Sequence, residues 1–322
     1  MPLISVSNIY KNFTKTSHSG VSGISLDIHE GEIVSIVGES GSGKTTLLKL
    51  IYGYLIPQEG EILFEGKRVL GPTEKLIPGH DEMKMVTQEL TLNLYARVYD
   101  NISSLLSNTD LDVKRDLTMQ TMEFLRIDHL AYKKIVELSG GEQQRVAIAR
   151  AVITEPRVLL LDEPFSQVDS ILKKQLRDDI ERLARFLKIT VIMVSHDPND
   201  GLSLSDKLVI VKEGKVVREG KPQEIYHHPQ HAYVAQLIGK ANILEGLSFL
   251  EKGKYAVYPQ DVVVKKDGIA AKVKSVHFGG LYQEVEYVIE DKIILSYDFD
   301  FLPLSRGDEI NIAFKKLIAL DS

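Results

Sequence analysis

The chain has 322 residues, enough for two domains, and 43% of them are hydrophobic, as in an ordinary globular protein. Its 39 basic and 45 acidic residues leave a formal net charge of −6, which argues against nucleic acid as the main partner. The absence of cysteine excludes disulfides, thiolate catalysis and cysteine-bound metals. The first ten residues do not have the pattern of a signal peptide, and no apolar run has the length needed to span a bilayer. We therefore expect a cytoplasmic protein that reaches a membrane only through a partner.

Strand patterns dominate the first 37 residues. Residues 24–28 alternate between apolar and polar side chains, as in a half-exposed strand, and residues 33–37 form a more apolar strand. The second strand leads directly into the glycine-rich segment GESGSGKT at 38–45, and residues 44–54 then read as a helix. This segment fits the pattern G-x-x-x-x-G-K-[ST] of a phosphate-binding loop.

The loop at 38–45 has the chemistry that a nucleotide requires. Its glycines let backbone N–H groups surround phosphates, Lys44 supplies a positive charge at the β- and γ-phosphates, and the Thr45 hydroxyl can ligate Mg²⁺. The alternative, a glycine- and serine-rich turn, is disfavoured because the motif stands between a predicted strand and a predicted helix. The candidate nucleotide-binding residues here are Gly38, Glu39, Ser40, Gly41, Ser42, Gly43, Lys44, Thr45 and Thr46.

Residues 90–150 have mostly helical spacing and predict a helical insertion. Near its end stands the octapeptide LSGGEQQR at 138–145. Ser139 offers a hydroxyl, Gly140 and Gly141 let backbone N–H groups approach an anion, and the helix expected from 142 to 153 favours negative charge at its start. Ser139 and Glu142 also form the pattern of a capping box, and both interpretations can hold together.

Acidic residues follow the next strongly apolar strand, at 158–161. Asp162, at the end of a strand near a phosphate-binding loop, can hold Mg²⁺, and Glu163 is placed to polarise an attacking water. Paired acids after a strand are also common as surface charge, but the preceding phosphate-binding loop favours the functional interpretation. A helix with leucine and isoleucine at helical spacing over 172–187 comes next. The repeated order of strand and helix predicts an open α/β sheet.

Three single residues are weaker candidates. His196 follows an apolar strand at 191–194, where it can contact the γ-phosphate or orient the water, although most single histidines are structural. Gln88 follows a short apolar strand and by itself reads as a turn residue. Phe13 is either a core aromatic or a ring that stacks on adenine.

The character of the sequence changes near residue 240. Short strand patterns at 261–264, 270–276, 282–289 and 310–314 are separated by Lys-Asp-Gly, Gly-Gly and Arg-Gly-Asp turns. Helical pattern is nearly absent. This part predicts a small all-β barrel or sandwich of about 80 residues.

With these motifs in order, the first 240 residues or so resemble the ATPases of ATP-binding-cassette (ABC) transporters. The resemblance makes 38–45 the Walker A loop and 166–169 the D-loop, which has Gln-Val where Ala-Leu is usual. It implies roles for single residues: adenine stacking by Phe13, Mg²⁺ and partner sensing by Gln88, Mg²⁺ binding by Asp162, general-base catalysis by Glu163, and a switch role for His196. In the signature motif, the resemblance implies contact with a γ-phosphate held by a second copy of the domain, made by Ser139, Gly140, Gly141 and Gln143.

A second resemblance covers the C-terminal part. The segments GKPQEIY at 220–226, YPQDV at 258–262 and RGD at 306–308 look like the junction and the small OB-like β domain, often called TOBE, of bacterial importer ATPases. These importers are of the sugar, polyamine, iron and molybdate type. The domain is short for that group and has Tyr-Pro-Gln where Arg-Pro-Glu is more common, so no particular solute follows. In the cassette, 94–98 departs from the usual aromatic-Pro-His segment after the glutamine, so the details of the contact with the membrane partner do not carry over.

The expected fold is an α/β P-loop NTPase of the ABC type followed by a small all-β domain. Its cassette spans 1–239, with a parallel sheet core, an N-terminal antiparallel β subdomain and a helical subdomain at about 90–150. Residues 240–322 form the OB-like domain, expected to be regulatory.

The expected function is ATP hydrolysis that energises solute transport, with import favoured, through a separate transmembrane permease. ATP and Mg²⁺ are the expected cofactors, and the chain is expected to work as a homodimer, peripheral on the cytoplasmic face of the cell membrane. A solute-binding protein outside the cytoplasm would act through the permease. Expected catalytic residues are Glu163, His196, Lys44 and Gln88; expected metal ligands are Thr45, Gln88 and Asp162.

Three alternatives remain beside this interpretation. A non-transport ABC protein acting on ribosomes or DNA usually carries two cassettes or a coiled-coil insertion, and this chain has neither. The second alternative is an exporter or lipid-extraction ATPase. Exporter cassettes of the fused type usually carry a Gly-Glu-Arg-Gly-like segment before the signature, where this chain has YKKIVE. A nucleotide-dependent scaffold with little turnover is disfavoured by Glu163 and His196.

Overall fold

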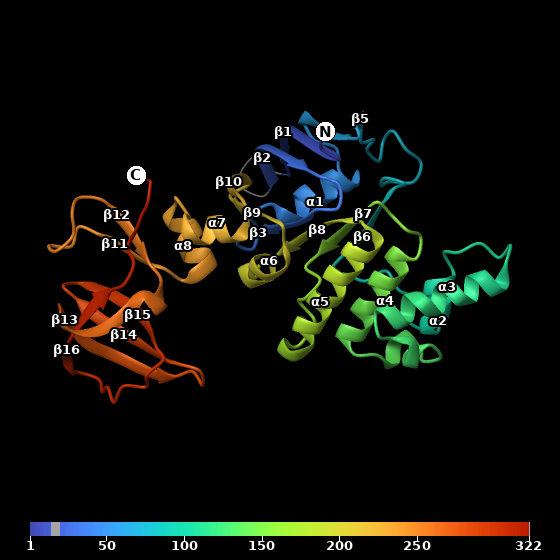
Figure 1. Cartoon of the computed structure of the whole chain (residues 1–322). Coiled ribbons are helices and arrows are strands. Elements are labelled where there is room, and N and C mark those ends of the chain that lie inside the picture. Colours follow the sequence, from blue (N-terminus) through green and yellow to red (C-terminus); the bar gives the residue numbers. More distant parts are fainter. Residues whose placement is uncertain (14–19, 322) are drawn as a thin grey trace. The chain divides into compact units, whose positions relative to one another are not determined.

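The structure, a computed structural model, describes residues 1–13 and 20–321 (Figure 1). Contacts divide the chain into two units, Met1–Pro222 and the part from Gln223 onward. Helices α7 (Pro222–His227) and α8 (Ala232–Gly239) therefore fall in the second unit, apart from Pro222, whereas the sequence places them with the cassette. The functional boundary after residue 239 stays a prediction.

The first unit is built around a sheet in the order β10-β9-β3-β8-β7-β6. Strands β6, β7, β8, β3 and β9 run parallel to one another, and β10 is antiparallel to β9. Every residue of β3, β7 and β8 is buried, as expected for central strands covered on both faces, and these three strands were predicted from their apolar runs. The strands are β3 (Ile33–Val37), β6 (Met83–Val86), β7 (Val158–Asp162), β8 (Thr190–Ser195), β9 (Lys207–Lys212) and β10 (Lys215–Gly220).

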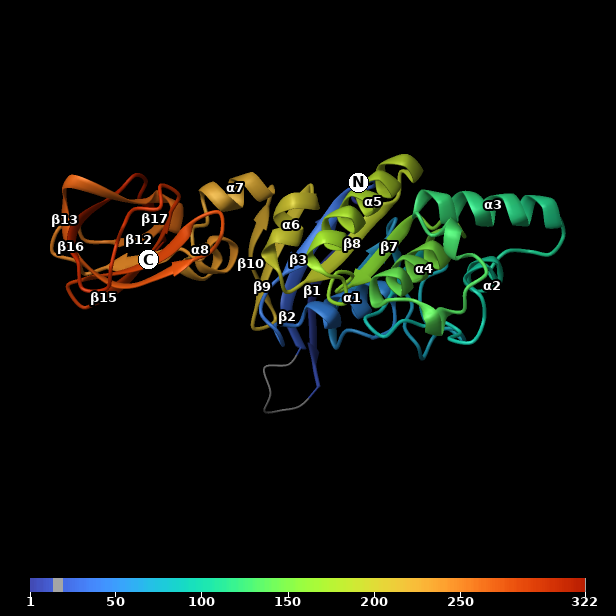
Figure 2. The same ribbon diagram turned by 90° about the horizontal axis from the view of Figure 1, so that it is seen from below.

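Side chains that alternate along each strand divide the sheet into two faces. In β7, Leu159 and Leu161 join one apolar cluster with helix α5 (Ser170–Leu187), while Val158 and Leu160 join another with helix α1 (Lys44–Tyr52). Figures 1 and 2 show α1 on one side of the sheet and α5 with α6 (Pro198–Leu204) on the other. Asp162 continues the alternation and therefore faces α1.

An antiparallel sheet in the order β2-β1-β4-β5 packs over the α1 face, in the same cluster as Leu47 and Ile51. This agrees with the strand patterns expected for residues 3–37. Its strands are β1 (Ile4–Asn12), β2 (Gly20–Ile28), β4 (Glu59–Phe64) and β5 (Lys67–Arg68).

The segment expected to be a helical insertion is helical in the structure. It packs on the α5 face, where Arg145 is ion-paired with the buried carboxylate of Asp179 and donates to the Leu125 carbonyl. Its elements are α2 (Val98–Ser103), α3 (Leu111–Phe124), the 3₁₀ turns η1 (Asp128–Leu130) and η2 (Ile135–Glu137), and α4 (Gly140–Val152).

The second unit contains two antiparallel sheets, in the orders β11-β12-β17 and β15-β14-β13-β16. Its core includes Val285, Tyr287 and Ile294, and the strand patterns predicted from the sequence lie within it. The elements are β11 (Asn242–Glu245), β12 (Lys254–Val257), η3 (Pro259–Asp261), β13 (Val262–Phe278), β14 (Gln283–Ile289), β15 (Lys292–Asp298), β16 (Glu309–Phe314) and β17 (Ile318–Ala319).

One turn expected in this unit is a bulge instead. The Lys-Asp-Gly segment was expected to separate two strands, but β13 is continuous and both of its parts pair with β16. Val264 and Ile269 both pair with Ile312, so residues 265–268 form an insertion in the ladder. A Cβ at Gly268 would lie 2.4 Å from the Ile312 carbonyl oxygen, so the bulge requires glycine there.

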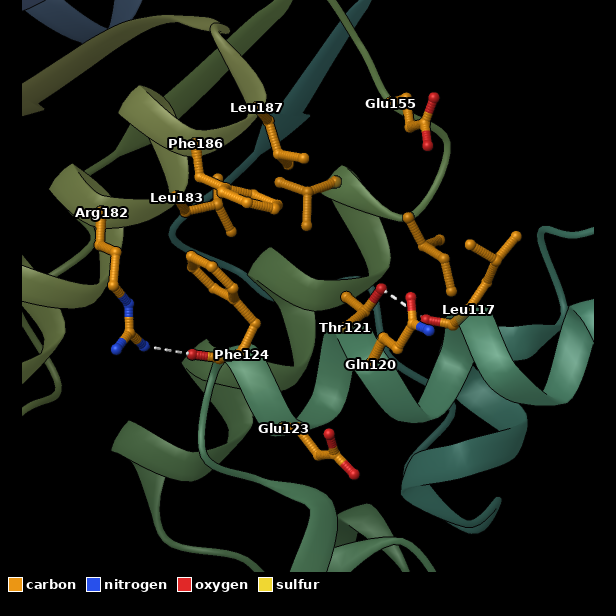
Figure 3. A pocket seen from close by; sticks show the side chains of 12 residues that line it. Leu117, Gln120, Thr121, Glu123, Phe124, Glu155, Arg182, Leu183, Phe186 and Leu187 are labelled. Atoms are coloured by element: carbon orange, nitrogen blue, oxygen red, sulfur yellow. Dashed lines mark hydrogen bonds between the residues drawn. The ribbon is translucent and has the colours of Figure 1, made fainter.

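An apolar groove of about 610 Å³ lies between α3 and α5 in the first unit (Figure 3). Phe124 and Phe186 face each other across it with ring centroids 5.6 Å apart, and Arg182 donates to the Phe124 carbonyl. None of its lining residues belongs to a motif identified in the sequence. We therefore do not place the active site in this groove, although it is large.

None of the helices in the described residues is both long enough and apolar enough to cross a membrane.

Candidate functional site

The candidate site lies where three neighbouring parallel strands end. In the ladder, Val37 of β3 pairs with Ser195 of β8, and Val194 of β8 pairs with Asp162 of β7. The residues that follow these strands therefore meet at one edge of the sheet, where open α/β sheets bind their ligands. They are the glycine-rich loop at 38–43, Glu163 and His196.

Crowded backbone makes two of the loop glycines necessary. A Cβ at Gly38 would lie 2.1 Å from the Val211 carbonyl oxygen, and a Cβ at Gly43 would lie 2.1 Å from the Gly20 carbonyl oxygen. Gly43, which precedes α1, also has a φ of 98°, a conformation that L side chains rarely adopt. The loop is thus held close against β9 and β2 and directed into the start of α1.

Lys44 lies across this loop. Its Nζ donates to the carbonyl oxygens of Gly38 at 2.9 Å and Glu39 at 2.7 Å. Burial lowers the pKa of Lys44, while the nearby carboxylates of Glu163 and Asp162 oppose that shift. The ammonium is therefore positioned at the start of α1, where an anionic ligand is favoured.

Ser42 adds a polar group that fits a phosphate. Its side chain is buried, and no described residue hydrogen-bonds its Oγ. Buried hydroxyls are normally paired, so this atom is suited to an external acceptor or donor. Together with the glycine-formed cradle and Lys44, it makes the loop fit a nucleotide's phosphates.

Thr45 and Asp162 form the candidate metal-binding pair. The Thr45 hydroxyl donates to Asp162 Oδ1 at 2.9 Å. Burial raises the pKa of Asp162, and the hydrogen bond from Thr45 opposes the rise. A hydroxyl and one carboxylate match the protein share of many Mg²⁺ sites, in which phosphates and waters supply the other ligands. The residues present therefore fit Mg²⁺.

Glu163 is held in an uncommon backbone conformation. Its φ is 51°, in the left-handed region that non-glycine residues seldom occupy, and its N–H donates to the Val194 carbonyl. The Glu163 Oε2 lies 3.2 Å from His196 Nδ1. Such strain is often found at functional sites, and here it directs the carboxylate toward the histidine on the neighbouring strand end.

The remaining candidates have fewer contacts. Gln88 is exposed two residues after β6, which pairs with β7 up to Val86. Phe13 is exposed at the end of the described N-terminal segment. Glu39 and Ser40 are exposed in the glycine-rich loop, and Thr46 is partly buried in α1.

The signature residues form a second group. Ser139 caps α4: its Oγ donates to Glu142 Oε2 at 2.8 Å and accepts from the Glu142 N–H, so the capping box is present. A Cβ at Gly140 would lie 3.2 Å from the Gln167 carbonyl oxygen, so the helix start approaches the segment at 166–169 closely. Gln143 Nε2 donates to the Leu138 carbonyl at 3.1 Å. The close approach at Gly140 joins the signature to the D-loop segment, the two hydrogen-bonded pairs lie within residues 138–143, and none of these contacts includes the phosphate-binding loop.

Sequence reasoning missed a buried charged group behind His196. Lys173 of α5 contacts Asp197 and Asp200, and the Ser195 Oγ donates to Asp200 Oδ2 at 2.7 Å. The signal available in the sequence was weak: Lys173 follows Asp169 by one helical turn, and acids after His196 read as surface charge.

A glycine-rich loop with a lysine, a strand-end aspartate beside its threonine, and a glutamate facing a histidine define a P-loop nucleotide hydrolase. Comparison with known proteins narrows the class. The family model described as "ABC transporter" matches residues 21–166. The "Spermidine/putrescine import ATP-binding protein PotA" of Mycoplasma capricolum is 37% identical over 88% of this chain and 79% of its own length. The protein of the same name from Borrelia garinii is 33% identical over 95% of this chain and 83% of its own length.

Solved structures agree. CbiO1 from Clostridium perfringens, described as part of an ABC transporter complex, is 29% identical with a TM-score of 0.62, over 70% of this chain and 90% of that chain. The dimeric cassette MJ0796, in a post-hydrolysis state bound to ADP and Pi, is 26% identical with a TM-score of 0.59, over 68% of this chain and 98% of that chain. This chain belongs to the ATP-binding proteins of ABC transporters. It is an ATPase subunit of an importer-type transporter, and the expectations of fold class and function are confirmed.

Proposed function

We propose that this subunit energises uptake of a polyamine. The observation that carries the proposal is the similarity to polyamine-import ATP-binding proteins over most of both chains, at 37% and 33% identity in two distant organisms. Because solute contacts belong to the permease and to an external binding protein, the test must use the complete transporter. Co-purified permease and this chain, reconstituted in vesicles with the binding protein, should take up spermidine or putrescine and not maltose. Uptake of neither polyamine would overturn the solute assignment and leave the ATPase unaffected.

For hydrolysis, we propose that Glu163 is the general base and that His196 orients it and contacts the γ-phosphate. The distance of 3.2 Å between Glu163 Oε2 and His196 Nδ1 supports this pairing. Lys44 and the loop N–H groups stabilise charge on the transferred phosphoryl group. Water attacks in line and passes its proton toward Glu163.

Mg²⁺ is proposed to bind at Thr45 and Asp162, with Gln88 as a further ligand from the neighbouring strand end. When bound, the ion would neutralise phosphate charge. The Thr45 hydroxyl already lies against the Asp162 carboxylate, so little rearrangement of these two side chains is required.

The signature is proposed to act across a homodimer. Ser139, Gly140 and Gly141 stand at the start of α4, where backbone N–H groups favour an anion. Because Ser139 bonds within this chain to Glu142, and Gly140 and Gly141 approach the D-loop, the phosphate that these residues serve would be the one held by the partner copy. Phe13 is proposed to stack on the adenine.

The permease is proposed to contact a groove of about 200 Å³ next to Gln88. Thr87, Leu92, Leu105 and Arg150 are among its lining residues, and it lies between β6 and the helical segment. A permease loop seated there would sense Gln88 and thereby the nucleotide. This would hold the subunit on the cytoplasmic face of the membrane.

The glutamate variant Glu163→Gln tests the hydrolytic role. Turnover should fall by on the order of a hundredfold or more, because a general base contributes about that much, while ATP affinity is retained. The variant should accumulate as an ATP-bound dimer in size-exclusion chromatography. Glu155→Gln, on an exposed glutamate after α4, is the matched control and should behave as wild type. Turnover within about threefold of wild type would remove Glu163 from this role.

The second unit is proposed to be regulatory and unnecessary for ATP binding, because the candidate phosphate-facing residues lie between Gly38 and His196. A chain that ends at residue 239 should retain ATP affinity, while its dimer fraction or its response to the permease changes. A matched chain that ends at Pro222 would show whether α7 and α8 matter. Loss of ATP binding by a folded truncated chain would contradict the assignment.

A further inference from the structure

A buried charge cluster lies behind the Glu163–His196 pair. Lys173 Nζ lies 2.6 Å from Asp197 Oδ2 and 2.9 Å from Asp200 Oδ1. The Asp200 side chain is only 1% exposed, while the Lys173 and Asp197 side chains are 19% and 31% exposed. Arg177 Nη1 also lies 3.6 Å from Asp200 Oδ1. Buried charges are costly unless they are paired with good geometry. The position of this cluster beside Glu163 and His196 therefore points to a role in catalysis as well as in stability.

The cluster fixes the loop that carries His196. Asp200 Oδ2 accepts from the Ser195 hydroxyl at 2.7 Å, and Ser195 Oγ accepts from the Asp197 N–H at 3.0 Å. The Asp200 N–H also donates to the Asp197 carbonyl at 3.2 Å. His196 thus stands between two residues whose side chains or backbone are held by Asp200. Its own ring, 55% exposed, has few other constraints on its position.

Lys173 lies in the first turn of α5, directly after the D-loop. Its backbone N–H donates to the Asp169 carbonyl at 2.8 Å, as in any α-helix, and the Asp169 side chain caps α5. Its ammonium also lies 5.9 Å from the centre of the Phe165 ring, two residues after Glu163. One side chain therefore reaches from the segment after Glu163 to the loop that carries His196.

Protonation agrees with a permanent ion pair. Burial alone would lower the pKa of Lys173, but its hydrogen bonds to Asp197 and Asp200 raise it above its usual value. Burial would likewise raise the pKa of Asp197, but the hydrogen bonds from Lys173 and the Asn199 N–H lower it. Lys173 and Asp197 therefore stay charged across the neutral range.

We propose that Lys173, acting through Asp197 and Asp200, is a positioning residue that sets His196 against Glu163. Lys173 touches neither nucleotide nor water in this role. A misplacement of about 1 Å at a reacting group can cost on the order of a hundredfold in rate, so loss of the Lys173 ion pairs is expected to lower turnover. The inference rests on the proposed roles of Glu163 and His196.

The test is a set of full-length variants assayed for ATPase activity and for ATP affinity. Lys173→Met should lower kcat by about tenfold or more with the KM and the number of ATP-binding sites unchanged. Lys173→Arg, which keeps the charge and its donors, should recover most of the loss. Lys174→Met, on the exposed neighbouring lysine, is the matched control and should behave as wild type.

Folding and positioning are separated by a double-mutant cycle. Lys173→Met leaves the buried Asp200 carboxylate with Arg177 as its remaining ion-pair partner, whose Nη1 lies 3.6 Å from Asp200 Oδ1, so the variant is expected to lose stability. Lys173→Met/Asp200→Asn, in which this carboxylate is absent, is therefore measured beside it. In a His196→Ala background, Lys173→Met should have no further effect on kcat, because the side chain that Lys173 positions is gone. Additive losses in that background, or a wild-type kcat in Lys173→Met, would overturn the proposal. If His196→Ala itself turns over normally, the proposed role of His196 fails instead.

Discussion

The two places expected to handle nucleotide in this chain are built in opposite ways. At the strand ends, one buried hydroxyl is left without an internal partner: Ser42 Oγ bonds to none of the described residues, while Lys44 donates to carbonyls of the loop itself. At the signature, the same kind of group is satisfied from within, because Ser139 and Glu142 bond to each other on both sides.

This difference indicates how much each place must rearrange when it binds phosphate. A site with an unpaired buried hydroxyl and a crowded glycine loop is preorganised, so ligand binding mainly adds contacts. The signature must exchange Ser139's bond with Glu142 for a bond with phosphate. The hydroxyl is held ready in a capping box, which also keeps the signature helix folded when no partner is present.

Ser139→Arg sharpens this comparison with the largest expected effect. ATPase activity should fall by on the order of a hundredfold, as for loss of a donor to a reacting group, while each monomer binds ATP as before. Activity and ATP affinity are measured on the same preparations. Ser139→Ala, which removes the cap without adding bulk, should also lower activity and cost about 1 kcal/mol of stability. Normal hydrolysis by Ser139→Arg would mean that the signature does not reach a partner's phosphate.

Lys44→Ala should affect binding first. Removing a charged hydrogen-bond donor at the phosphates should weaken ATP affinity by about tenfold to a hundredfold, measured by calorimetry. Lys67→Ala, on an exposed lysine of β5, serves as the control. An unchanged affinity would reduce the loop at 38–45 to a structural turn and remove the contrast with the signature.

Much of this contrast was predictable because strands and loops carry local signals. The apolar runs at 33–37, 158–161 and 191–194 predicted the central strands, since strands buried on both faces need continuous apolar sequence. The glycine-rich loop, Glu163 and His196 each follow one of those strands, so they were expected to meet at one edge of the sheet. Both predictions depend only on local sequence and on the parallel pairing of the strands.

What the sequence did not predict depends on contacts between distant residues. Lys173 and Asp200 are 27 positions apart and form a pair only because α5 and α6 cover the same face of the sheet. The bulge at 265–268 carries the composition of a turn, and only its pairing with Ile312 on both sides makes it part of one strand. The left-handed backbone of Glu163 has no sequence signal, because glutamate does not favour it.

Asp162→Asn, the smallest effect, tests the claim that the strand-end site is held at a cost to stability. Burial raises the pKa of Asp162 in the folded protein, so the ionised form destabilises the fold above the usual pKa of aspartate, and this cost disappears as pH falls through the raised pKa. Asparagine keeps the acceptor for the Thr45 hydroxyl and removes the charge. Near pH 7 and without nucleotide, the free energy of unfolding of the variant should therefore exceed that of wild type by on the order of 1 kcal/mol, which raises its Tm. The variant should also lose its response to Mg²⁺ and ATP. The difference in Tm should narrow as pH falls through the raised pKa of Asp162, where the wild-type carboxyl becomes protonated. A lower Tm for the variant at neutral pH, or a difference independent of pH, would show that Asp162 stabilises the fold and that the strand-end site is no less internally satisfied than the signature.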